Sequence, residues 1–221
     1  MTKPLLMQNR ILGILFLTLA TQLYAQESFD KDSRRFDIKL DMAAFSGTVK
    51  DNYTKDVSEF GAASLVLASQ MSWAVSNRVS IGGSVAFSNY LDSAGASGSN
   101  PTLRGLDGNF LFDIHLMCRP KTDMILGLKL GIAGIRYNPD DGTGDVYGSP
   151  GTTTDLHWTT RFYVSEKIAI IANLAFPRYR FGQFGKNLKE TSTVNFSGYC
   201  IGTGVTFKLP NKKTGGTQRN K

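Results

Sequence analysis

The feature that most constrains the fold is a two-residue alternation of apolar and polar side chains, which recurs along most of the 221-residue chain. In the segment 36–45, Phe36 and Ile38 fall on one parity, whereas Asp37 and Lys39 fall on the other. Successive side chains of a β-strand point to opposite faces, so this pattern predicts strands with one apolar and one polar face. Similar runs follow, and they begin at Ala63, Val79, Gly105, Met124, Thr153, Ile168 and Ser197.

The lengths of these strands and of their connections predict a particular all-β architecture. Each strand has about ten residues or more, against ~5–6 in most soluble sheets, and a tilted transmembrane strand needs ~9–11. Short connections (76–78, 120–123 and 165–167) alternate with long polar ones (47–59, 89–103, 138–152 and 182–191). We therefore predict an eight-stranded antiparallel up-and-down transmembrane β-barrel with short periplasmic turns and long extracellular loops.

Alternation alone does not say which way the apolar face points, because a soluble ligand-binding barrel turns it inward and a membrane barrel turns it outward. Three observations favour lipid: the polar face is rich in charges, it also holds the small residues that a narrow lumen needs, and aromatic residues gather near both strand ends. Those near the short turns are Phe36, Trp73, Phe162 and Phe207, and those near the long loops are Phe60, Phe87, Tyr90, Tyr137, Phe176, Tyr179 and Phe196.

The ionisable residues on the polar face are the candidate site. A charge in a low-dielectric lumen must be paired, so Lys39, Lys129 and Arg161 are expected to pair with the aspartates. Side chains fill an eight-stranded lumen, and this network is therefore expected to close the barrel; a gated proton or ion path is the alternative. The predicted network is Asp37, Lys39, Asp41, Asp107, Asp113, His115, Lys129, Asp155, His157 and Arg161.

No cofactor site and no metal site are expected from the sequence, and the cysteine count bears on the metal. Two cysteines are too few for a disulfide scaffold or a structural zinc site. Cys118 and Cys200 fall on opposite walls of the predicted barrel, too far apart for the ~7 Å limit of a disulfide, so both are expected to be free thiols.

The N-terminus has the pattern of a secretory signal peptide. Lys3 and Arg10 precede an apolar stretch, 11–20, and Ala25 fits the cleavage site; the stretch is shorter than the ~20 residues of a membrane helix. Removal of this segment leaves 23 basic residues against 18 acidic ones, and four of the basic residues lie in the last ten, so no nucleic-acid partner is expected. The expected organisation is a signal peptide (1–25), a polar periplasmic lead-in (26–34), the barrel (35–209) and a flexible basic tail (210–221).

In this architecture, the segment 35–209 resembles the small eight-stranded outer-membrane barrels of the OmpA-like and OmpX-like group. Such barrels commonly end on an aromatic residue that the assembly machinery reads, and Phe207 is placed for that role although 14 residues follow it. OmpA-like proteins carry a periplasmic peptidoglycan-binding domain after the barrel, and none is expected here.

The resemblance implies a location in the outer membrane of a Gram-negative cell, with lipid, lipopolysaccharide and the barrel-assembly machinery as partners. The expected role is structural or one of surface interaction, carried by the extracellular loops, in which no pattern identifies a ligand. A narrow ion or small-solute conduit, a lipid-modifying enzyme and a soluble periplasmic ligand-binding barrel are the alternatives. Lipid-modifying barrels use His with Ser or an acid; His115 and His157 occur in no His-x-Ser pairing, so we expect no enzymatic activity.

Overall fold

The computed structural model of the protein describes residues 31–51, 53–91, 102–138, 147–184 and 192–210. The predicted signal peptide, most of the lead-in and the tail beyond Pro210 lie outside these residues. Among the described residues, no helix is long and apolar enough to cross a membrane. The strands are β1 (Arg34–Asp51), β2 (Val57–Ala74), β3 (Val79–Leu91), β4 (Thr102–Arg119), β5 (Thr122–Asn138), β6 (Tyr147–Tyr163), β7 (Ile168–Phe184) and β8 (Ser192–Leu209).

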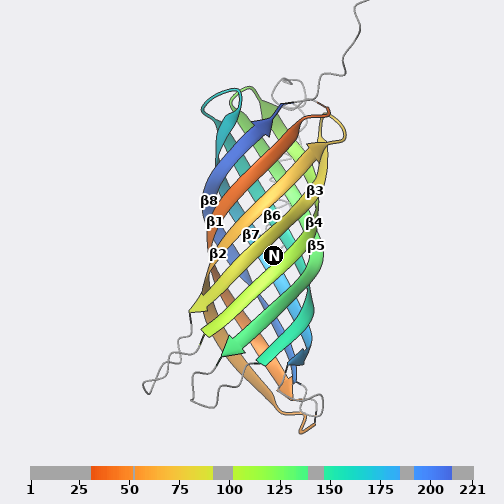
Figure 1. Ribbon diagram of the computed structural model, residues 1–221, viewed down its shortest axis with the longest axis vertical. Helices are drawn as coiled ribbons and strands as arrows, with labels where there is room; N and C mark the ends of the chain where they lie inside the picture. The colour runs from red at the N-terminus through yellow and green to blue at the C-terminus, as the bar shows by residue number, and fades with distance from the viewer. Residues whose placement is uncertain (1–30, 52, 92–101, 139–146, 185–191, 211–221) are drawn as a thin grey trace, which may run out of the picture.

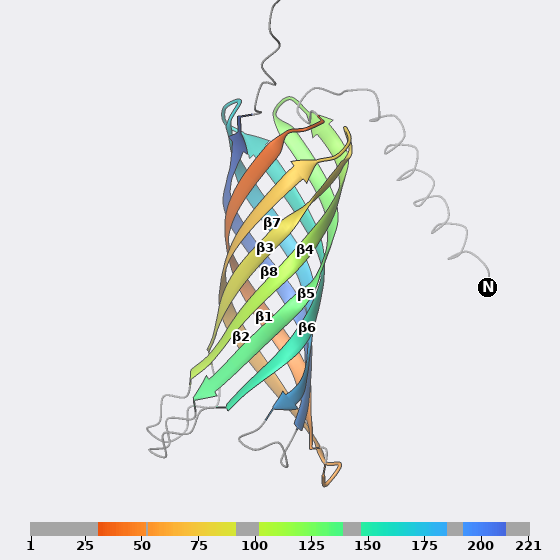
Figure 2. The same cartoon turned by 45° about the vertical axis from the view of Figure 1, so that its right-hand side comes forward.

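These eight strands form one closed antiparallel barrel, as predicted. Each strand pairs with its neighbour in sequence, and β1 pairs with β8 to close the sheet, with Met42 opposite Ile201. The start of β1 and the end of β8 lie at the same end of the barrel, at the top of Figure 1, and all strands are strongly tilted (Figure 2). The three short turns share this end with the two termini of the barrel, and the long connections leave from the other end.

Most strands extend further toward the long-loop end than the hydrophobic pattern indicates. The predicted loop 47–59 is too long. In the structure β1 continues to Asp51 and β2 begins at Val57, with Thr48 opposite Glu59. An 18-residue strand spans roughly 45 Å along the axis at ~3.3 Å per residue and a tilt of ~40°, which exceeds an apolar band of ~25 Å. Beyond that band, exterior positions such as Ser46 and Thr48 are polar, whereas Val49 packs inside the barrel. The pattern of an apolar exterior and a polar lumen face therefore no longer marks the strand.

Two of the short turns are closed by a serine side chain in the same way. The Ser76 Oγ accepts hydrogen bonds from the backbone N–H groups of Arg78 (3.2 Å) and Val79 (3.1 Å). The Ser165 Oγ does the same for Lys167 (3.3 Å) and Ile168 (3.1 Å). A hydroxyl that satisfies its own turn in this manner favours a tight reversal, which keeps the β2–β3 and β6–β7 hairpins short.

The apolar face points outward, as predicted for a membrane barrel. Large apolar side chains such as Ile132 (73% exposed), Met42 (65%) and Leu106 (58%) cover the exterior, whereas Asp113 in the lumen is 1% exposed. A soluble monomer rarely exposes a contiguous apolar patch above a few hundred Å². An apolar exterior around a charged interior is the arrangement that lipid requires.

The predicted aromatic belt at the long-loop end is wrong for four of its members. Phe60 packs against the aromatic residues inside the barrel, with its ring centroid 6.0 Å from that of Phe196. Phe87 and Phe176 are exposed on the exterior, but Tyr90 and Phe196 are each 5% exposed and face the lumen, as does Tyr179. Tyr90 and Tyr179 each follow an outward phenylalanine by three residues, and an odd separation places two side chains of a strand on opposite faces. These inward rings belong to an aromatic cluster in the lumen, made of Phe45, Tyr90, Tyr179, Phe181 and Phe196.

Candidate functional site

All ten ionisable residues predicted for the lumen lie inside the barrel. Nine of them are buried, and the side chain of Lys129 is 11% exposed. Within each strand they are separated by an even number of positions, so the two-residue period turns them to the same face of that strand. They come from β1 (Asp37, Lys39, Asp41), β4 (Asp107, Asp113, His115), β5 (Lys129) and β6 (Asp155, His157, Arg161).

The tightest cluster lies near the short turns and is centred on Asp123, at the start of β5. Its Oδ2 accepts hydrogen bonds from Arg35 Nη1 (3.1 Å) and Arg161 Nη1 (3.2 Å). Arg161 also donates from Nη2 to Asp37 Oδ2 at 2.7 Å. Two guanidinium groups therefore face two carboxylates, which is the balance that buried charges need.

A second hydrogen-bonded chain reaches Asp123 from the opposite side. His115 Nδ1 lies 2.7 Å from Asp123 Oδ1, and His115 Nε2 lies 3.1 Å from Ser80 Oγ. Serine, histidine and aspartate follow one another here in the order of a hydrolase triad. However, Ser80 is 2% exposed and His115 is 1% exposed, so an ester or amide substrate has no access to the hydroxyl. These three side chains are thus part of the buried hydrogen-bond network around Asp123.

The same place brings together three groups that can bind metals. A register shift between His115 and Met117 turns Cys118 inward, and ligand atoms of His115, Cys118 and Asp123 lie within 4.8 Å of one another. Both carboxylate oxygens of Asp123 are already used, one by His115 and the other by the two arginines. Both ring nitrogens of His115 are used as well, and a cation would lie beside two guanidinium groups that repel it, so these residues do not fit a metal ion. Cys118 and Cys200 are free thiols.

A hydrogen-bonded histidine–aspartate pair and a lysine–aspartate ion pair occupy the middle of the lumen. His157 Nε2 lies 3.0 Å from Asp113 Oδ1, and Lys129 Nζ lies 2.8 Å from Asp155 Oδ2. A side chain at Gly127 would collide with both His157 and Asp113, so the glycine makes room for this pair. The small residues on the polar face thus have a steric role beside the large charged ones.

The other three predicted residues bind neutral partners instead of opposite charges. Lys39 Nζ donates to Gln70 Oε1 (2.9 Å), and Asn173 Nδ2 donates to Asp41 Oδ2 (3.1 Å). Asp107 accepts hydrogen bonds from Asn109 Nδ2 (2.5 Å) and from the hydroxyl of Tyr179 (3.3 Å). Tyr179 belongs to the aromatic cluster, so this bond connects the ionisable residues to the aromatic cluster on their long-loop side.

Sequence reasoning missed several members of this network. The sequence pattern places Asp123 in a turn and Arg35 at the very start of the barrel. In the structure both side chains are buried and bind each other. Their odd numbers extend the alternation of β1 and β5 into the turn region, which is the signal that would have found them. Gln70 and Asn173 lie on the polar face of their strands, but the pattern does not indicate that their neutral amides bind charged groups.

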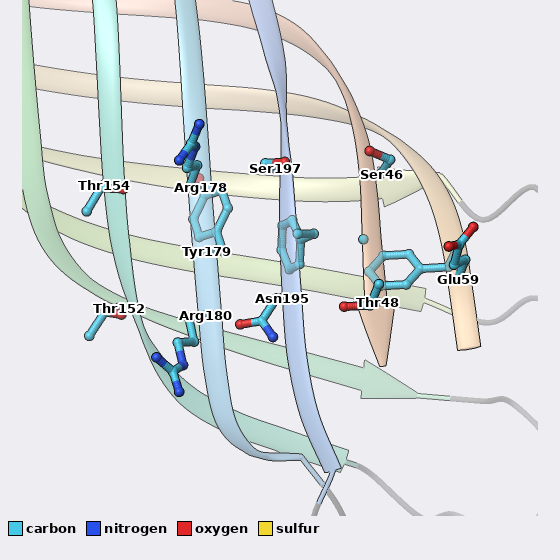
Figure 3. Close-up of a pocket in the computed structure, with 13 residues that line it drawn as sticks. Ser46, Thr48, Glu59, Thr152, Thr154, Arg178, Tyr179, Arg180, Asn195 and Ser197 are labelled. Carbon is cyan, nitrogen blue, oxygen red and sulfur yellow. The ribbon is translucent and has the colours of Figure 1, made fainter. Parts of the chain in front are cut away.

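A second candidate site is a hollow of about 690 Å³ near the long-loop end. Most of its lining residues are on the exterior wall, and the inward-facing Phe60, Tyr179 and Phe196 also line it. Arg178 and Arg180 on β7 lie there, with Thr154 and Thr152 opposite them on β6. On the other side, Ser197 and Asn195 on β8 pair with the same two arginines, as Figure 3 shows. The hollow continues to Ser46 and Thr48 on β1 and to Glu59 on β2.

Comparisons with known proteins address the fold. No family model and no curated protein sequence matches the chain. Among solved structures, the NMR structure of the outer-membrane protein AlkL in DMPC bilayers is similar with a TM-score of 0.51, at 9% identity over 83% of this chain and 93% of that one. OprG of Pseudomonas aeruginosa (TM-score 0.47, 12% identity, 83% and 100% covered) and Neisserial surface protein A (0.48, 11%, 79% and 97%) also match. The chain thus has the barrel fold of small outer-membrane proteins.

Proposed function

We propose that the protein is an integral outer-membrane barrel whose structural or surface-interaction role is carried by its extracellular loops. The observation that carries the proposal is the combination of an apolar exterior with a lumen filled by buried side chains, among them Arg35, Arg161 and Phe181. An exterior of this kind assigns the wall to lipid, and a filled eight-stranded lumen leaves no room for diffusing solutes. The segments that connect the strands at the long-loop end remain as the working parts.

The proposed route to the membrane follows the usual order for such proteins. A signal peptide removed after Ala25 exports the chain, and the barrel-assembly machinery inserts it, with Phe207 as its C-terminal aromatic signal. Phe207 is exposed on the exterior of β8, where another protein can reach it before insertion. Outer-membrane phospholipid and lipopolysaccharide then surround the wall.

Cell fractionation and gel mobility test this location. The protein is expected in the outer-membrane fraction, and it is expected to migrate differently before and after boiling, because a folded membrane barrel resists SDS at room temperature. Recovery in a periplasmic wash, with a mobility that boiling leaves unchanged, would contradict a membrane barrel and would favour a soluble one.

Two experiments test the division of labour between lumen and loops. Purified protein in planar bilayers is expected to give no stable single-channel steps; regular steps would favour the narrow conduit. In cells, replacement of residues 92–101, 139–146 or 185–191 by a short Asn-Gly turn is expected to reduce attachment to surfaces or resistance to detergent while leaving the amount of folded barrel unchanged. Unchanged behaviour of all three variants would contradict a role for the loops.

The buried Ser80–His115–Asp123 chain is proposed to be structural and not catalytic. A fluorophosphonate probe, which labels activated serines, is expected to leave the folded barrel unlabelled. Labelling that disappears in Ser80→Ala would overturn this proposal and would support an enzyme.

A further inference from the structure

Four arginines lie on the exterior of the barrel where its apolar surface ends, toward the long loops. On β7, Arg178 follows the exposed Phe176; on β4, Arg104 precedes the exposed Leu106 by two residues. Arg136 on β5 and Arg180 on β7 complete the set, and all four side chains are exposed on the exterior. We refer to Arg104, Arg136, Arg178 and Arg180 as the arginine belt.

The charges of this belt are not balanced within the described part of the chain. No ion pair joins these arginines to an acid that the structure describes. Arg104 lies directly opposite Arg136 in the β4–β5 ladder, and like charges at such a position destabilise a sheet. An anion shared by the two guanidinium groups would remove that repulsion.

The exterior hollow contains the densest part of the belt. Arg178 and Arg180 are flanked by the hydroxyls of Thr152, Thr154 and Ser197 and by the Asn195 amide, all capable of donating hydrogen bonds to an oxyanion. Guanidinium groups bind phosphate through two parallel hydrogen bonds. Glu59, the acid in the hollow, lies on β2, three strands from β7 and therefore roughly 14 Å away at ~4.8 Å per strand.

The surface next to the hollow is apolar, so an anion that also carries hydrocarbon chains fits the site better than a free anion. Toward the middle of the barrel, the next outward side chains are Phe176 on β7, Leu156 on β6 and Tyr199 on β8, which are 46%, 50% and 57% exposed. A ligand that fills both regions has a phosphorylated head and hydrocarbon chains that run along the wall. A free phosphate would use the first region alone.

We propose that this hollow binds the phosphorylated head of an outer-leaflet glycolipid, the lipid A portion of lipopolysaccharide, with Arg178 and Arg180 on a phosphate. The proposal rests on the outer-membrane location proposed above, and it adds a specific site to it.

Native mass spectrometry of the refolded full chain in detergent, with purified bisphosphorylated lipid A, tests the site. The wild-type barrel is expected to retain lipid A, and Arg178→Gln/Arg180→Gln is expected to lose at least about tenfold in affinity, because the charge-assisted hydrogen bonds are gone. The control Arg119→Gln/Lys121→Gln removes two exposed positive charges at the short-turn end and is expected to bind as the wild type does. Boiling-dependent gel mobility shows that each variant is folded.

Three results would overturn the proposal. These are equal binding by wild type and Arg178→Gln/Arg180→Gln, equal binding of lipid A from which both phosphates have been removed, and displacement of lipid A by millimolar inorganic phosphate. The last result would identify a simple anion site without a lipid requirement. Each of them would leave the outer-membrane location intact, since that is measured independently by fractionation.

Discussion

Asp123 is the residue on which most contacts in the lumen converge, since Arg35, Arg161 and His115 all bind its carboxylate. Removal of one partner from a buried ion pair leaves an uncompensated charge and costs about 3–5 kcal/mol. Asp123→Ala is therefore expected to lower the free energy of unfolding by about that amount, measured by urea titration of the barrel in lipid vesicles. Glu166→Gln, in an exposed turn, is the control and should leave the unfolding midpoint unchanged; an equally small effect of Asp123→Ala would contradict the network.

Gly202 shows how a missing side chain makes room for a charged one. A Cβ at this position would overlap the Asp41 carboxylate and the Leu40 carbonyl on the neighbouring strand. Gly202→Ala is expected to destabilise the barrel by about 1–3 kcal/mol through overpacking. A Cβ at Gly134, on the exterior, would have no other atom within 4 Å. Gly134→Ala should therefore have little effect on the free energy of unfolding measured by urea titration. If the two variants were equally stable, the packing described for β1 and β8 would be incorrect.

At the scale of the strands, the aromatic cluster occupies the long-loop end of the lumen. Phe196 lies at its centre, with ring centroids 4.8 Å from Tyr179, 5.3 Å from Phe45 and 5.6 Å from Phe181. Aromatic pairs at these distances attract one another beyond the burial of their area. The members of the cluster come from β1, β3, β7 and β8. The cluster therefore holds four strands together on the long-loop side of the ion pairs.

Phe196→Ala is expected to open this layer and to destabilise the barrel by about 3–5 kcal/mol. In planar bilayers, the variant is expected to show intermittent conductance that the wild type lacks. Phe176→Ala removes an aromatic ring from the exterior and serves as the matched control, without conductance. A silent Phe196→Ala barrel would mean that the ion-pair layer closes the lumen by itself.

The β1–β2 connection depends on pH through Asp51. Its Oδ1 accepts hydrogen bonds from the backbone N–H groups of Tyr53 (2.6 Å) and Thr54 (2.9 Å), and these bonds lower the pKa of the carboxyl below its usual 3.8. A lowered pKa means that the stabilisation is complete at neutral pH and is lost as the pH falls through the lowered value. The protection factor of the Thr54 amide, which is the intrinsic exchange rate divided by the rate measured by NMR at the same pH, is expected to exceed that in Asp51→Ala at neutral pH. It is expected to fall to the value in Asp51→Ala only at strongly acidic pH. Indistinguishable exchange in the two proteins would contradict this turn.

Comparison of the strands with their predictions shows where a hydrophobic pattern stops being informative. In the apolar band, alternation places every strand and turns all ten lumen residues inward, because lipid on one side and a charged lumen on the other demand opposite chemistry. Beyond it, Ser46 and Thr48 continue β1 with polar groups on the exterior, and the strand end is invisible to the pattern. Tyr90 and Phe196 were misplaced because an aromatic residue suits both an interface belt and a lumen.

The pairing inside the lumen was less predictable than its membership. Parity says which side chains share the interior, but the stagger between strands decides which of them meet. Arg161 lies on β6 and Asp37 on β1, and they meet at 2.7 Å across the lumen, not across a ladder. No spacing in the sequence encodes that contact.

On the scale of the whole molecule, the barrel has three parts: an apolar wall, a filled lumen and a polar long-loop end with the arginine belt. Each part follows from a different demand of the membrane, since hydrocarbon excludes charges from the wall, the closed sheet satisfies the backbone, and the headgroup region attracts basic groups. The central claim is that the apolar exterior is in contact with lipid.

Tryptophan fluorescence tests this claim directly, because the chain has two tryptophans and both Trp73 (47% exposed) and Trp158 (37%) lie on the exterior. After refolding into vesicles, both are expected to be quenched by lipids with brominated acyl chains and to be protected from aqueous acrylamide. Strong quenching by acrylamide, with no response to brominated lipids, would show that the apolar wall does not face a membrane and would contradict the account.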